Sequence, residues 1–245
     1  MKIIGVIPAR YNSSRFEGKP LALINAKPMI IHVAEQVEKA LGRENTYIAT
    51  DDYRISELAE SYGYNSVMTS ELCLTGTDRL WEFAKKVKAD IYINVQGDEP
   101  MVSPIDIKSI INEKKKNMDY VINGMLPLSK SESAHDINIP KVLVNKDNNL
   151  IYMSRLPIPG SKDLQNKSDP IFLKQVCIYA FSYDQLKIFG TNSEKAEYEY
   201  FEDIEILRFL DFNIPIKMVL MKKETIAVDN PKDIERVEKA LNKLR

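Results

Sequence analysis

A short basic segment directly after the first apolar run contains the residues whose chemistry is easiest to interpret. It places three cations and two hydroxyl groups within ten residues, from Arg10, Ser13, Ser14, Arg15 and Lys19. Forked guanidinium groups, a compact ammonium group and backbone N–H donors are together suited to a triphosphate. The alternative is a solvated basic loop. Because the sequence has no G-x-G-x-x-G or G-x-x-x-x-G-K-[ST] motif, dehydrogenases and P-loop ATPases are disfavoured.

Two aspartates are candidate metal ligands. Asp98 follows the apolar run 90–95 within the sequence Gly-Asp-Glu-Pro, and Asp229 stands shortly before Pro231. A carboxylate beside a polyphosphate needs a hard cation between them, and Mg²⁺ is usually held by one or two carboxylates together with phosphate oxygens. Structural alternatives stay open for both residues, a tight turn for Asp98 and a helix cap for Asp229. We expect Glu99 to be structural.

Other charged or titratable residues carry weaker signals. Arg79 is expected in the first turn of a helix over 78–88, where a cation is unfavourable unless an anion or a polar ligand lies nearby. His32 is expected on the surface and His135 in a loop. Neither histidine is therefore given a catalytic role.

The elements that position these residues follow from the pattern of apolar runs. Runs of strand length alternate with longer segments of helical period, which is typical of an α/β protein with a largely parallel sheet. We expect strands at 3–7, 46–50 and 90–95 and helices at 28–41, around 55–59 and at 78–88. Because ligands of doubly wound sheets bind at the carboxyl ends of the strands, the basic segment and Asp98 should meet at one edge.

The pattern changes from about residue 119. Strand-like runs follow one another with little helix between them, at 120–122, 141–144, 150–153 and 175–181, with a polar loop over 157–170. We interpret 119–182 as a strand-rich insertion that carries substrate contacts and a subunit interface. A helix over 202–210, a strand over 214–220 and a helix from 231 complete a single domain of residues 1–245.

The composition excludes several classes of protein. The 245 residues carry 34 basic and 35 acidic side chains, a net charge of −1, which disfavours a nucleic acid partner. The two cysteines, Cys73 and Cys177, lie far apart and suggest neither a disulfide framework nor structural zinc. No apolar stretch has the ~20 residues of a membrane span, and none reads as a signal peptide. We expect a cytoplasmic protein with no membrane partner.

Taken together, several segments resemble the 3-deoxy-manno-octulosonate cytidylyltransferases, the CMP-Kdo synthetases. The matching stretches occur in the family's order at 7–21, 27–30, 49–52, 75–80, 94–101, 152–155, 157–159 and 228–237. The resemblance implies a Rossmann-like nucleotidyltransferase fold, with a mostly parallel central sheet and an inserted strand-rich lobe. It further implies a homodimer that uses CTP and Mg²⁺ and acts on a small sugar acid.

The resemblance also implies roles for individual residues. Those of the nucleotide side, including the triphosphate ligands, would be Pro8, Ala9, Arg10, Ser13, Ser14, Arg15, Lys19, Arg79 and Gln96. Asp98 and Asp229 would hold magnesium and, with Lys19 and Arg15, form the catalytic group. Arg155, Gln175, Tyr179 and Glu205 would contact the sugar acid, and the Arg155 guanidinium suits its carboxylate because the two groups form parallel hydrogen bonds.

The sugar-acid side departs from the family pattern at three places. Where the family reads Arg-His-x-Gly-Ile-Tyr this chain has Lys-Gln-Val-Cys-Ile-Tyr at 174–179, Ile206 replaces a glutamine, and Gly160 replaces a tryptophan. The leading hypothesis is transfer of CMP from CTP to the anomeric hydroxyl of Kdo or a close relative. The alternatives are another acidic or phosphorylated acceptor and a non-catalytic CTP-binding protein. The pathway, lipopolysaccharide or capsule biosynthesis or another glycan, stays open.

Overall fold

A nine-stranded, mostly parallel sheet forms the centre of the protein. The computed structural model describes residues 1–245 except 14, 15, 161, 163–169, 193, 244 and 245. The strand order is β11-β7-β10-β6-β1-β4-β5, and β10 alone on this path runs antiparallel to its neighbours. The bounds are β1 Ile3–Ala9, β4 Thr46–Thr50, β5 Asn65–Met68, β6 Ile91–Val95, β7 Val121–Pro127, β10 Leu173–Ser182 and β11 Ile216–Leu220. The predicted α/β class with a mostly parallel sheet is confirmed.

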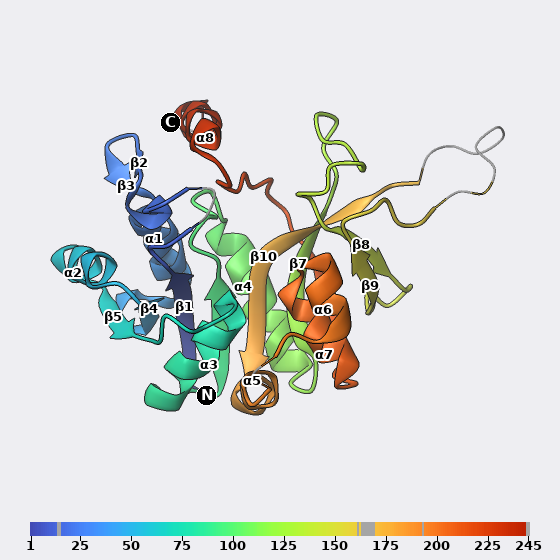
Figure 1. Ribbon diagram of the computed structural model, residues 1–245, viewed down its shortest axis with the longest axis horizontal. Helices are drawn as coiled ribbons and strands as arrows, with labels where there is room; N and C mark the ends of the chain where they lie inside the picture. Colours follow the sequence, from blue (N-terminus) through green and yellow to red (C-terminus); the bar gives the residue numbers. More distant parts are fainter. Residues whose placement is uncertain (14–15, 161, 163–169, 193, 244–245) are drawn as a thin grey trace.

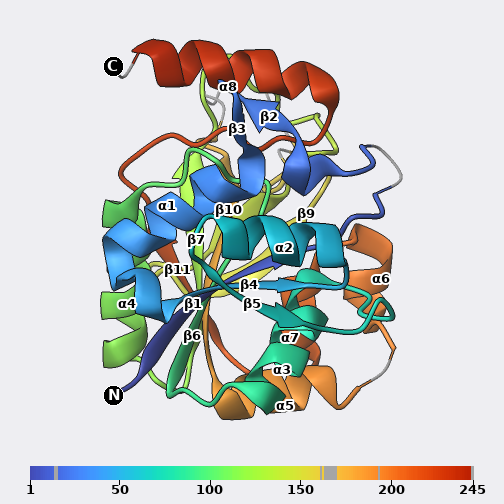
Figure 2. The ribbon, with the colours of Figure 1, turned by 90° about the vertical axis from the view of Figure 1, so that its left-hand side faces the viewer.

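Helices cover both faces of this sheet (Figures 1 and 2). One core cluster packs the sheet against α1 (Met29–Leu41), α2 (Tyr53–Ser61) and α4 (Pro104–Lys116). The other packs it against α3 (Gly76–Lys86), α5 (Tyr183–Gly190) and α7 (Arg208–Asp211). The strands between the two clusters, such as β6, are buried on both sides, which is why they are continuously apolar in the sequence.

A third, small cluster lies above the carboxyl edge of the sheet, where α8 (Pro231–Lys243) packs beside a short hairpin (Figure 1). The hairpin strands are β2 (Leu23–Ile24) and β3 (Lys27–Pro28), and one-turn helices η1 (Lys19–Leu21) and η2 (Arg43–Asn45) precede and follow this region. Ile24, Val228 and Val237 are fully buried in the cluster. This packing places the segment that carries Asp229 beside the loop that follows β1.

The predicted insertion is divided between two places. β7 and β10 lie on the main path of the sheet, while β8 (Lys141–Val144) and β9 (Leu150–Ser154) form a branch of it, in which β8 pairs with β9 and with the first two residues of β10. The role of this region in substrate contact and dimerisation stays a prediction.

Two expectations about local structure are wrong. The single helix expected over 202–210 is broken into α6 (Glu197–Glu202), η3 (Glu205–Leu207) and α7, because Asp203 adopts a left-handed φ of 50° between them. His32 is buried, with 9% of its surface exposed, because the β2–β3 hairpin covers α1 and its Nε2 lies 2.9 Å from the Ile24 carbonyl oxygen. Among the helices of the described residues, none has the length and apolar character that crossing a membrane requires.

Arg208 joins the helices of the second face through buried charges. Its Nε and Nη2 donate to the two carboxylate oxygens of Glu199 at 2.6 and 2.7 Å, and Nη1 donates to Asp78 Oδ1 at 3.0 Å. Arg208 and Glu199 are both fully buried. Asp78 in turn accepts from the backbone N–H of Thr75 and caps α3. The network therefore fixes the start of α3 from inside the protein.

Replacing Arg208 by methionine is expected to lower the free energy of unfolding by about 3–5 kcal/mol, because Glu199 would remain as an uncompensated buried charge. Chemical denaturation followed by circular dichroism measures this change. The matched control is Lys239→Met, whose ion pair with Glu235 is 77% exposed on both sides and should be worth less than about 1 kcal/mol. Equal effects of the two substitutions would contradict the assignment.

Candidate active site

The loop after β1 is folded back on itself so that its basic residues face the sheet edge. Gly18 has a φ of 65°, a left-handed value that suits glycine, and its N–H donates to the Tyr11 carbonyl oxygen at 2.9 Å. The turn carries Lys19 inward. Lys19 Nζ then donates to Asp98 Oδ2 at 2.7 Å and to the Val228 carbonyl oxygen at 3.0 Å. Ser14 and Arg15, predicted triphosphate ligands in the same loop, lie outside the described residues.

Asp98 and Asp229 are brought to the same cavity. The backbone N–H of Val228 donates to the Asp98 carbonyl oxygen at 2.9 Å, so Asp229 follows directly after a residue that is bonded to Asp98. Both aspartates line a cavity of about 810 Å³. Because α8 begins at Pro231, Asn230 rather than Asp229 holds the cap position, and the side chain of Asp233 accepts from the N–H groups of both residues. The helix-cap explanation of Asp229 is therefore weakened.

The donor set of these two aspartates suits magnesium. Within the described part of the chain there is no cluster of three or more His, Cys, Asp or Glu side chains that could hold a metal on its own. Magnesium needs only one or two carboxylates when phosphate oxygens of a substrate complete its shell. The carboxylates of Asp98 and Asp229 fit that requirement.

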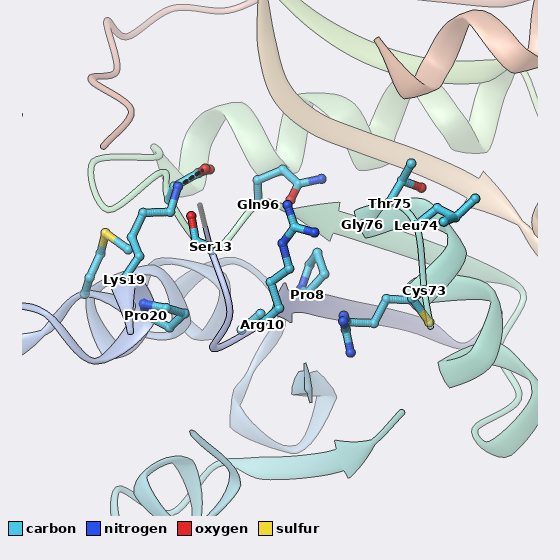
Figure 3. Close-up of a pocket in the computed structure, with 15 residues that line it drawn as sticks. Pro8, Arg10, Ser13, Lys19, Pro20, Cys73, Leu74, Thr75, Gly76 and Gln96 are labelled. Carbon is cyan, nitrogen blue, oxygen red and sulfur yellow. Dashed lines mark hydrogen bonds and ion pairs between the residues drawn. The ribbon is translucent and has the colours of Figure 1, made fainter. Parts of the chain in front are cut away.

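A second cavity, of about 190 Å³, lies between the loop after β1 and the start of α3 (Figure 3). It brings together most of the residues that were predicted for the nucleotide side, namely Pro8, Ala9, Arg10, Ser13, Lys19, Arg79, Gln96 and Asp98. Figure 3 shows Arg10 pointing towards Gln96 and the ion pair of Lys19 to one side. Cys73, Leu74, Thr75 and Gly76 complete the opposite wall, and of these only Thr75 and Gly76 fell within a matched segment.

Arg79 is buried and reaches from α3 to the carboxyl ends of β4 and β5. Its Nη2 donates to Asp51 Oδ2 at 2.7 Å and its Nη1 to Thr69 Oγ1 at 2.6 Å. A cation in the first turn of a helix needs a nearby anion, and for Arg79 the protein itself supplies one, the carboxylate of Asp51. A contact between Arg79 and a nucleotide stays a prediction.

The two cavities share a set of lining residues, which we call the junction: Arg10, Leu74, Thr75, Gly76, Gln96 and Asp98. On the far side of the junction the larger cavity is lined by all four residues predicted for the sugar acid, Arg155, Gln175, Tyr179 and Glu205. The arrangement offers two binding spaces that meet at Asp98. This is the geometry that transfer of a group between two substrates requires.

The guanidinium of Arg155 is largely committed to backbone oxygens. It donates to the carbonyl oxygens of Ile137 and Asp203 at 2.8 Å each and to that of Glu202 at 2.5 Å. Arg155 thus holds the loop before β8 against the end of α6. Binding of a substrate carboxylate by Arg155 stays a prediction, and the structure shows in addition that Arg155 has a structural role.

The three departures from the family pattern are not equivalent in the structure. Gln175 lines the larger cavity, and its Nε2 donates to Asn123 Oδ1 at 3.1 Å. Ile206 is 1% exposed and belongs to the hydrophobic core. Among the described residues other than its chain neighbours, none has an atom within 4 Å of a Cβ added at Gly160. Of the three places, only the 174–179 segment lines the cavity, through Lys174, Gln175 and Cys177.

Several residues of the larger cavity were not identified from the sequence. Lys174 Nζ donates to Glu132 Oε1 at 2.5 Å, and Lys195 Nζ donates to Asp203 Oδ1 at 2.7 Å. Arg236 also lines this cavity. Lys174 stands where the family has arginine, and this departure could have identified it from the sequence as a residue of the sugar-acid side. Lys195 lies in the loop before α6 and Arg236 lies on α8, and their printed partners, Asp203 and Asp233, are within the same part of the chain, so their local sequence gave no sign that they line a cavity.

Burial raises the pKa of three groups in the cavity wall. Burial raises the pKa of Glu99 to about 7, and Glu99 Oε2 accepts from the Thr225 hydroxyl at 2.5 Å. Burial likewise raises the pKa of Glu205 and of the Tyr179 hydroxyl. A structural role for Glu99 agrees with its 3% exposure.

Comparison with known proteins identifies the family. A family model described as cytidylyltransferase matches residues 4–226. A 3-deoxy-manno-octulosonate cytidylyltransferase from Phocaeicola vulgatus is 36% identical over 97% of this chain and 96% of its own, and one from Escherichia coli is 36% identical over 96% and 94%. An 8-amino-3,8-dideoxy-manno-octulosonate cytidylyltransferase from Shewanella pealeana is 37% identical over 98% and 99%.

Solved structures agree with the sequence relatives. A CMP:2-keto-3-deoxy-manno-octonic acid synthetase complexed with CTP superposes with a TM-score of 0.91 at 36% identity, covering 100% of both chains. A glucose-1-phosphate thymidylyltransferase from Bacillus anthracis, at 12% identity and a TM-score of 0.70, shares the fold. With its junction, its two cavities and these relatives, the chain belongs to the cytidylyltransferase family, within the group of the 3-deoxy-manno-octulosonate cytidylyltransferases.

Proposed function

We propose that this protein transfers CMP from CTP to the anomeric hydroxyl of 3-deoxy-manno-octulosonate (Kdo) and releases pyrophosphate. The observation that carries the proposal is the Lys19–Asp98 pair, 2.7 Å apart, at the place where the smaller, cationic cavity and the larger cavity meet. The names of the relatives and the CTP bound by the structural neighbour support the two substrates.

The smaller cavity suits the nucleotide because its wall next to β1 is cationic. Arg10 and Lys19 supply positive charge, and Ser13 supplies a hydroxyl donor on the same wall. These groups offset the charge of a triphosphate and hold its α-phosphorus near Asp98. As the bond to pyrophosphate breaks, negative charge grows on the leaving oxygens, and preorganised cations stabilise it most strongly at that stage.

Asp98 and Asp229 are the residues that would hold magnesium. The metal would supply Lewis-acid stabilisation of the phosphate oxygens. Lys19 pairs with Asp98 in the absence of ligands and holds its carboxylate at the junction. In the reaction the sugar hydroxyl attacks the α-phosphorus in line with the departing pyrophosphate, and the chain's main contribution is to align the two substrates.

The identity of the sugar acid is the finer part of the proposal. Relatives of near-equal identity are named for Kdo and for its 8-amino-3,8-dideoxy analogue, so overall similarity does not discriminate between them. Of the three places where the chain departs from the family pattern, only 174–179 lines the larger cavity, through Lys174, Gln175 and Cys177. We favour Kdo because most of the named relatives act on it, with the 8-amino sugar as the second candidate.

We further propose a cytoplasmic homodimer. Apolar side chains are exposed on the β8–β9 side of the molecule, with Ile151 at 53%, Leu156 at 66% and Phe201 at 75%. Such a concentration favours a protein contact. A second copy of the chain is the partner that the resemblance implies.

The function is tested with purified protein, CTP, Mg²⁺ and a panel of Kdo, its 8-amino analogue and other acidic or phosphorylated sugars, by following pyrophosphate release. Kdo is expected to give the highest kcat/KM. A higher value with the 8-amino sugar would transfer the assignment to that substrate. Binding of CTP without turnover of any panel member would instead support a non-catalytic CTP-binding protein.

Substitution of Lys19 by alanine or Asp98 by asparagine is expected to lower kcat by about 100-fold or more, since removing one preorganised charge can cost ~3–4 kcal/mol of transition-state stabilisation. Steady-state kinetics with saturating CTP measure the loss. Asp147→Asn, in an exposed turn, is the matched control and should leave kcat unchanged. Near-normal turnover of a correctly folded Lys19 or Asp98 variant would refute the role of that residue.

Magnesium dependence gives a separate test of the two aspartates. Chelation with EDTA is expected to abolish pyrophosphate release, and Asp229→Asn to raise the Mg²⁺ concentration for half-maximal rate by about tenfold, in line with the loss of one ligand carboxylate. A titration of rate against Mg²⁺ measures both effects. Full activity in excess EDTA would exclude the metal assignment, while an unchanged titration would remove Asp229 from it.

A further inference from the structure

Glu205 makes two hydrogen bonds that tie three separate segments together at the junction. Its Oε2 accepts from the backbone N–H of Thr77, in the first turn of α3, at 3.1 Å. Its Oε1 accepts from Gln96 Nε2, directly after β6, at 3.1 Å. Glu205 itself belongs to η3, which follows the break at Asp203. Its carboxylate is therefore engaged within the protein on both oxygens.

The contact with Glu205 determines which way the Gln96 amide faces. Both carboxylate oxygens of Glu205 act as acceptors, so the contact selects the amide nitrogen of Gln96 and turns the amide oxygen away. In Figure 3 this oxygen is directed towards the Arg10 guanidinium, at the junction. Gly76 leaves room for this amide, because a Cβ at that position would lie 2.6 Å from Nε2 and 3.1 Å from Oε1.

At the junction, Gln96 Oε1 is the side-chain oxygen best able to accept a hydrogen bond from a ligand. Arg10 has donors only. The Thr75 hydroxyl donates to Asp78 Oδ2 at 2.7 Å and accepts from the Asp78 N–H at 3.1 Å. Asp98 pairs with Lys19 through Oδ2 and is one of the two residues proposed to hold magnesium. The remaining two residues of the junction, leucine and glycine, have no polar side-chain atom. A hydroxyl group of a substrate bound there would therefore donate to Gln96.

We propose that Glu205 is a positioning residue, which holds Gln96 so that its amide oxygen receives a hydroxyl group of the sugar acid. The inference rests on the proposed function, and it changes the role first expected for Glu205, which was direct contact with the sugar. Glu205 acts through Gln96. A flipped amide would present two N–H donors next to the Arg10 guanidinium and would leave the hydroxyl without an acceptor.

The test is a double-mutant cycle between Glu205 and Gln96. In Glu205→Gln the new side chain has one acceptor oxygen for two donors, so Gln96 is free to flip. We expect kcat/KM for the sugar acid to fall by about tenfold or more, with the Kd for CTP, measured by calorimetry without sugar acid, changed by less than about twofold. Gln96→Met removes the amide and should have a similar effect.

The double variant decides between the two roles of Glu205. If Glu205 acts through Gln96, adding Glu205→Gln to Gln96→Met causes no further loss, because the group that Glu205 positions is already absent. If Glu205 contacts the sugar directly, the two losses multiply, and the proposal is overturned. Unchanged kcat/KM in Glu205→Gln alone would also overturn it.

Two controls keep the result interpretable. Glu197→Gln, at an exposed position of α6, should leave both kinetic constants and CTP binding unchanged. If Glu205→Gln does not fold, Glu205→Asp takes its place in the cycle, because it keeps the charge but is one methylene too short to reach Gln96. Wild-type protein that releases no pyrophosphate with any sugar acid would count against the proposed function. A normal Glu205 variant of an active enzyme would count against this inference alone.

Discussion

The site depends on one interaction at the carboxyl edge of the sheet, in which the ammonium group of Lys19 donates to a carboxylate and to a backbone carbonyl oxygen. Lys19 joins three segments that are far apart in the sequence, the loop after β1, the turn after β6 and the chain leading into α8. Its side chain is only 17% exposed, so the charge pair is shielded from solvent and salt. A protein of net charge −1 has no general attraction for a triphosphate, and it has to concentrate cations locally.

The position of this site was predictable because sheet topology converts order in the sequence into closeness in space. Parallel strands β1 and β6 are neighbours, so the residues that follow them must meet at one edge. That argument alone placed Lys19 and Asp98 together. Asp229 was different, since the residues before Pro231 fitted a helix cap as well as a ligand. Only the resemblance favoured a ligand, and the hydrogen bond between Val228 and Asp98 shows that Asp229 lies close enough to Asp98 for the proposed shared role.

What could not be predicted depends on contacts between segments with no local signature. Apolar periodicity does not reveal strand direction, so nothing in the run around Val176 showed that β10 lies antiparallel within the main sheet. His32 looked exposed because its own helix face is polar, and the hairpin that covers it is recognisable only after folding. The hydrogen-bond partners of Glu205 and of Arg155 come from segments that are distant in the sequence. Both residues were expected to contact the substrate because of their position in the family pattern, and in the structure both form hydrogen bonds with the protein.

The two sides of the junction are held by different kinds of ion pair, buried on the nucleotide side and exposed on the sugar side. This difference explains how the specificity of such a fold for the sugar can change while the nucleotidyl transfer reaction is kept. On the nucleotide side, the start of α3 is held by Asp78, which is itself bonded to the fully buried Arg208. On the sugar side, the wall contains pairs such as Lys195 with Asp203, whose carboxylate is 72% exposed. Exposed pairs contribute little to stability, so their replacement costs little, whereas replacing a buried one disturbs the fold. Sequence changes that alter the substrate are therefore expected on the sugar side. Glu205 hydrogen-bonds to the start of α3 and to Gln96, so a substitution of Glu205 is the sugar-side change that would act most directly on the residues of the junction.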